Sequence, residues 1–154
     1  MANPYVLPKV MLAFRDAIAA QNFEWVGTCA AGLQRGALDE NGNIRPDSNP
    51  LPSVIVRAKT ATPYTPESPD FAVDVEVSVS HSADDTSEVD HMTQAGQVLG
   101  FLYDSDLADT LNANSNLTVQ QISNVGQSVD IDGRAWVSTF RLQLFAVGSN
   151  LSLS

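Results

Sequence analysis

Side chains that could bind a metal gather in the middle of the chain, around two histidines. Five of them lie close together: His81, Asp84, Asp85, Asp90 and His91. Their spacing matches none of the usual tetrahedral zinc patterns. A carboxylate or hydroxyl just before a helix commonly caps its free N–H groups, and residues 84–88 (DDTSE) carry such a capping signal. We therefore interpret the acids as helix caps, predict no metal here, and expect His91 to lie in solvent.

Two other acidic segments have the spacing of partial calcium loops. One contains Asp104, Asp106 and Asp109, and the other is the run Asp130-x-Asp132-Gly133. Neither carries the full series of oxygen ligands that ends in a bidentate glutamate. The start of a helix explains the first segment, and a tight turn explains the second. We predict no calcium site and no cofactor.

Nucleophilic catalysis also lacks a local signature. Cys29 is the only cysteine, which excludes an internal disulfide, and both histidines are far from it in the sequence. The chain has neither a GxGxxG motif nor a phosphate-binding loop. We expect a protein that is not an enzyme. The alternative is a cation-dependent binding module, or a small metal-dependent hydrolase, built on the acidic helix starts.

Charge is divided unequally along the chain, whose formal net charge is −10. Residues 1–66 carry six basic and five acidic side chains, whereas residues 67–154 carry thirteen acids and only Arg134 and Arg141 as bases. Such a surface repels phosphate backbones, which disfavours direct nucleic-acid binding. Solubility alone accounts for the acidity equally well. A basic protein partner, a divalent cation, or a surface that must not stick to DNA would each account for it too.

Hydrophobic periodicity predicts a hairpin and three helices. Residues 70–80 alternate with period two, with an apolar side chain at each odd position from Phe71 to Val79. Residues 53–60 form a second strand, and antiparallel pairing places Arg57 and Lys59 opposite two acids, Asp74 and Glu76. Helical spacing predicts a helix that starts near Pro4 or Pro8 and ends near residue 20, a central helix and a short helix over 106–112. The predicted buried stripe of the central helix is Val89, Met92, Gly96, Leu99, Leu102 and Tyr103.

The C-terminal third predicts a second hairpin. It consists of a bulged strand over 117–125, a turn at 126–128, a short extended piece over 129–132, and a long strand from Trp136 to Ala146. We expect residues 21–52 to form a long mobile loop, and 148–154 a frayed tail. The fold predicted for residues 1–154 is a single α+β domain. It has one layer of mostly antiparallel sheet, packed by an N-terminal helix and a central helix pair. No apolar run approaches the about 20 residues that cross a bilayer.

Between Ser53 and Val147 the chain resembles tail-terminator (tail-completion) proteins from the neck of tailed bacteriophages. The resemblance lies in residues 52–56 (PSVIV), 73–77 (VDVEV), 84–85 (DD) and 132–142 (DGRAWVSTFRL). It implies an N-terminal helix, a hairpin, central helices and a closing hairpin. It also implies a virion protein, assembled in the host cytoplasm into a hexameric ring that caps the tail tube. Head-closure and other connector proteins of the neck are the alternative within this class.

A ring of this kind implies certain partners and surfaces. The partners are copies of the chain, the tail tube protein and the head-closure protein; DNA passes without specific binding, and no membrane is involved. The predicted contacts between subunits are the mixed odd face of the last strand and one tryptophan: Val137, Thr139, Arg141, Phe145 and Trp25. We expect Asp104, Asp106 and Asp109 to face the lumen, where negative charge keeps DNA from sticking.

Overall fold

The computed structural model describes residues 6–33, 40–42, 51–66, 70–113, 117–132 and 134–149. Helix α1 (Val6–Ala19) is followed by strands β1 (Thr28–Ala31), β2 (Ser53–Pro63) and β3 (Phe71–Ser82). Helices α2 (Glu88–Leu102) and α3 (Leu107–Ala113) then precede β4 (Leu117–Thr118), β5 (Gln121–Asp132) and β6 (Ala135–Ser149). The described strands form one sheet in the order β1-β2-β3-β6-β4, and β5 also pairs with β6. The predicted α+β class, with one mostly antiparallel sheet, is confirmed.

The hairpin of β2 and β3 is antiparallel, as predicted, and supplies the centre of the core. Val73, Val75, Val77 and Val79 are all buried, while Phe71 at the strand's start is partly buried. Val77 lies between Val56 of β2 and Phe140 of β6 in the register. The alternation of β3 therefore places one face of the sheet in the core.

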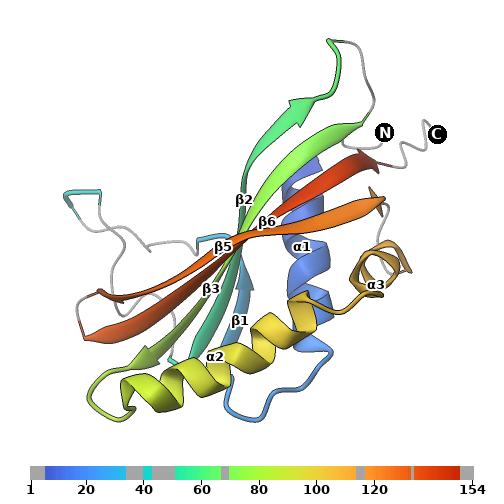
Figure 1. Ribbon diagram of the computed structural model, residues 1–154. Helices are drawn as coiled ribbons and strands as arrows, with labels where there is room; N and C mark the ends of the chain where they lie inside the picture. The colour runs from blue at the N-terminus through green and yellow to red at the C-terminus, as the bar shows by residue number, and fades with distance from the viewer. Residues whose placement is uncertain are drawn as a thin grey trace.

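The helices α1, α2 and α3 lie on this buried face of the sheet (Figure 1). In α1 the side chains of Val10, Phe14 and Ile18, which are three or four residues apart, join the strand residues in one apolar core. No described helix packs on the opposite face. We call that opposite surface the open face. None of the described helices has the length and apolar character needed to cross a membrane.

Three predicted segments differ from the structure. The 21–52 loop contains β1, whose Cys29 pairs with Val54 in a parallel ladder; residues 34–39 and 43–50 of that loop lie outside the described residues. The turn predicted at 126–128 is wrong, because β5 continues through it with a bulge near Val125. In the predicted C-terminal tail, Gly148 of β6 pairs with Thr118 of β4, while residues 150–154 lie outside the described residues.

Candidate functional site

The open face carries a cluster of basic side chains around a single glutamate. Glu76 of β3 lies between Arg57 of β2 and Arg141 of β6 in the register. Lys59 Nζ is 3.2 Å from Glu76 Oε2, and Arg141 Nε is 3.9 Å from Glu76 Oε1. The open face also carries Asp74 and Asp130, so its three cations are balanced by three acids, although the whole chain is strongly acidic. We call Arg57, Lys59 and Arg141 the basic cluster.

Four of the five predicted contact residues lie on this open face. Val137, Thr139, Arg141 and Phe145 occupy alternate positions of β6, opposite the positions that enter the core. Arg141 is exposed, and the other three are half-buried. The open face therefore combines apolar, hydroxyl and charged groups.

Trp25, the fifth predicted contact residue, lies apart from these four. Its ring stacks on His81 with centroids 5.0 Å apart, and its indole N–H donates to Gln97 Oε1 of α2 at 2.9 Å. The ring of Phe23 stacks on it from 6.0 Å. Trp25 therefore anchors the segment after α1 to α2, on the helix side of the sheet.

The buried stripe predicted for α2 is wrong for most of its members. Leu102 is buried as predicted, but the other buried residues of α2 are His91, Ala95 and Val98, which the predicted stripe does not contain. Three large members of the predicted stripe are exposed: Val89 by 72%, Met92 by 49% and Tyr103 by 57%. Together with Gly96 they follow one another at helical spacing, and we call these four residues the α2 ridge.

A groove of about 240 Å³ runs beside the α2 ridge, between α2 and the outer strands of the sheet. Its apolar lining includes Met92, Leu99, Val129 and Phe140. Val125 and Ile131 of β5 are also exposed apolar side chains.

Two buried histidines face each other beneath α2, which contradicts the prediction that His91 lies in solvent. His81 is the next-to-last residue of β3 and His91 lies in the first turns of α2; they are 1% and 0% exposed. Their Nδ1 atoms are 2.6 Å apart. His81 Nε2 is 2.5 Å from Gln94 Oε1, and His91 Nε2 is 2.7 Å from Ser138 Oγ. These four side chains form a continuous hydrogen-bonded chain across the interface of helix and sheet.

One set of tautomers satisfies this chain without any net charge. With Gln94 Oε1 as acceptor, His81 donates through Nε2–H and accepts at Nδ1. His91 then donates through Nδ1–H and accepts the Ser138 hydroxyl at Nε2. Burial and the neighbouring His81 lower the pKa of His91 to about 4, and burial also lowers the pKa of His81. Both rings are neutral near pH 7.

The order Ser138, His91, His81 is that of a nucleophile, a base and an orienting group. A base with a pKa of about 4, however, removes protons poorly at neutral pH. Ser138 is only 4% exposed and lies between Val79 and Val129 in the middle of the sheet, where strand pairing occupies its backbone. We therefore assign the four side chains the structural role of fixing α2 on the sheet.

The prediction that the acids are helix caps holds for Asp104 but is wrong for the acids around the start of α2. Ser87 caps α2 by accepting from the N–H of Asp90 at 3.1 Å, while Asp84 Oδ2 lies 3.6 Å from Arg134 Nη1. Asp104 accepts from the N–H of Asp106 at 2.9 Å, which confirms that this segment starts a helix. Within the described ranges, no three or more His, Cys, Asp or Glu side chains come together as a possible metal site. Asp104, Asp106 and Asp109 are exposed around the start of α3.

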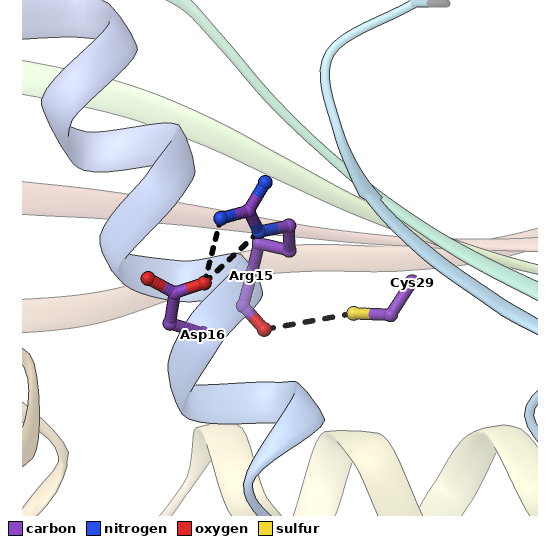
Figure 2. Close-up of polar contacts among 3 residues, drawn as sticks. All are labelled: Arg15, Asp16 and Cys29. Carbon is purple, nitrogen blue, oxygen red and sulfur yellow. Dashed lines mark hydrogen bonds and ion pairs between the residues drawn. The ribbon is translucent and has the colours of Figure 1, made fainter.

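The surroundings of Cys29 disfavour a nucleophilic thiolate. Its Sγ lies 3.6 Å from the carbonyl oxygen of Arg15, to which the thiol donates, while the Arg15 guanidinium contacts Asp16 at 2.8 Å (Figure 2). Burial raises the pKa of the Cys29 thiol, so less of the nucleophilic thiolate is present at neutral pH. The partly buried Cys29 packs against the core.

Comparison with known proteins adds no relative: no protein-family model matches the chain, and no curated protein matches its sequence.

Proposed function

We propose that this chain is a structural subunit of a bacteriophage tail neck. Copies of it assemble into a ring, hexameric in the tail terminators that it resembles, that caps the tail tube and joins it to the head connector. One observation carries the proposal: the described helices cover a single face of the sheet, and the open face presents half-buried Val137, Thr139 and Phe145. Such a surface gains stability when a second protein covers its apolar parts.

The order of elements supports the same proposal. A helix, a long hairpin, two central helices and a closing hairpin follow one another along the chain, as the resemblance to tail terminators implies. The ends of both hairpins extend past the helices in Figure 1. Extended hairpin ends can reach a neighbouring subunit or the tube without disturbing the core.

The distribution of charge suits a ring around DNA. Asp104, Asp106 and Asp109 are exposed at one corner of the molecule, where α2 meets α3. Acids that line a lumen repel the phosphate backbone, so DNA passes without being held. The proposed lumen side is therefore this corner, while the open face contacts protein.

Electron microscopy of the purified chain mixed with tail tubes tests the proposal. We expect rings at the tube ends, and light scattering of the chain at high concentration should show a matching oligomer. Chelator should leave both unchanged. Bare tube ends, together with a melting temperature that rises sharply on adding calcium or zinc, would replace the proposal with the cation-dependent alternative.

A further inference from the structure

We infer that neighbouring copies meet head to tail, with the α2 ridge of one copy packed on the open face of the next. This inference rests on the proposed function for the existence of an assembly, and adds which surfaces form it. The open face receives a helix from the neighbour, so the sheet is then covered on both of its faces. The occupant of the open face is thus a second copy of this chain.

The shapes of the two surfaces match. Helix α2 has 15 residues, which at 1.5 Å per residue is about 22 Å. The four long strands β2, β3, β6 and β5 lie side by side, so the open face is about 14 Å wide between its outer strands. An α2 helix can therefore lie along or across this face. Val89, Met92 and Tyr103 would bury their exposed apolar surface against Val137 and Phe145.

Charge disfavours one of the symmetric alternatives to this arrangement. Acids gather before and within the first turn of α2, beside the ridge: Asp84, Asp85, Glu88 and Asp90. Two ridges packed together would bring acids against acids, whereas two open faces, each with three cations and three acids, would meet without net repulsion. The head-to-tail contact sets the acids beside the ridge against the basic cluster, and the symmetry that a ring requires excludes the pairing of two open faces.

A head-to-tail contact also has the symmetry that a ring requires. The two surfaces are different patches, the open face on one side of the sheet and the ridge on the helix layer. Contacts between unlike patches leave the growing assembly with one free patch of each kind, so addition continues until the ring closes. A contact between like patches stops at a dimer.

Disulfide trapping between copies tests the inference. In a Cys29→Ala background, the pair Met92→Cys and Thr139→Cys puts one thiol on the ridge and one on the open face. Under mild oxidation we expect a ladder of covalent oligomers on a denaturing gel. Each single substitution should give no ladder. The pair Leu12→Cys and Thr139→Cys is the matched control, because Leu12 is an exposed apolar residue of α1, and it should give none.

Each outcome of the crosslinking either supports or overturns the head-to-tail arrangement. A covalent dimer from Thr139→Cys alone would show open faces packed together and would overturn the inference. A double variant that stays uncrosslinked would also overturn it, since oxidation traps even brief contacts. Failure of the proposed function can be told apart from failure of this inference. If the proposed function is wrong, the tube ends stay bare in electron micrographs, whatever the crosslinking shows.

A charge exchange gives a second, independent readout. Arg141→Glu should raise the concentration needed for half-assembly by about tenfold or more, and Glu88→Arg should do the same. The two substitutions together should restore assembly, because the pair then meets with its signs reversed. Equal losses in the single and double variants would contradict the head-to-tail arrangement.

Discussion

Lowering the pH should decrease the free energy of unfolding of this protein through protonation of His91. The pKa of this histidine falls from 6.5 to about 4 on folding, because burial and the adjacent His81 disfavour its charged form. Such a group binds a proton more readily in the unfolded chain. The stability it contributes is therefore complete above pH 6.5 and is lost as the pH falls toward 4.

The size of the effect follows from these two values. One histidine with this shift lowers the free energy of unfolding by about 2 kcal/mol between pH 7 and pH 5. His81 changes it in the same direction, since burial lowers its pKa as well. A loss of this size is a large part of the stability of a domain of ordinary length.

Urea unfolding at several pH values between 5 and 7 measures the effect. The dependence on pH should flatten in His91→Gln, because glutamine does not titrate. Asp90→Asn, a substitution at the exposed neighbouring residue, is the control and should keep the wild-type dependence. Equal pH dependence in the wild type and His91→Gln would refute the role assigned to the histidine pair.

Three further predictions concern the core, the polar chain and the proposed lumen. Val77→Ala should lower the free energy of unfolding by about 2 kcal/mol in urea titration, against less than about 0.5 kcal/mol for the exposed Val125→Ala; equal losses would contradict the burial of β3. Ser138→Ala leaves His91 Nε2 without its partner, so it should cost about 1–3 kcal/mol in the same assay, and an unchanged midpoint would contradict the contact. Asp106→Lys with Asp109→Lys should slow DNA ejection from assembled particles in a dye-release assay; unchanged ejection would remove these acids from the lumen. Asp104 is left in place there because it caps α3.

The hairpin and the helix starts could be predicted from sequence because their signals are local. Alternation from Val73 to Val79 is typical of a half-buried strand, and the opposite charges of Lys59 and Glu76 meet as the hairpin requires. Strand β1 gives no comparable signal. Cys29 to Ala31 are small residues whose strand partner begins at Ser53, so only a contact distant in sequence makes them a strand.

Helix α2 shows why periodicity alone misplaces the candidate site. It carries two stripes at helical spacing, the ridge that begins at Val89 and the buried set of His91, Ala95, Val98 and Leu102. The ridge is the more apolar at its start, so periodicity favours it as the core stripe. Residue type alone places His91 in solvent, although its spacing of four, three and four to the other buried residues matches the buried stripe. His81, near the end of the alternating strand, is the hydrogen-bond partner that offsets the cost of burying the His91 ring.

The most direct test of the account is a three-dimensional reconstruction of the chain assembled on a tail tube. It should show a closed ring in which Thr139 and Val137 are covered by α2 of the adjacent subunit, with Asp106 and Asp109 turned to the channel. A ring whose open faces point outward to water would contradict the account.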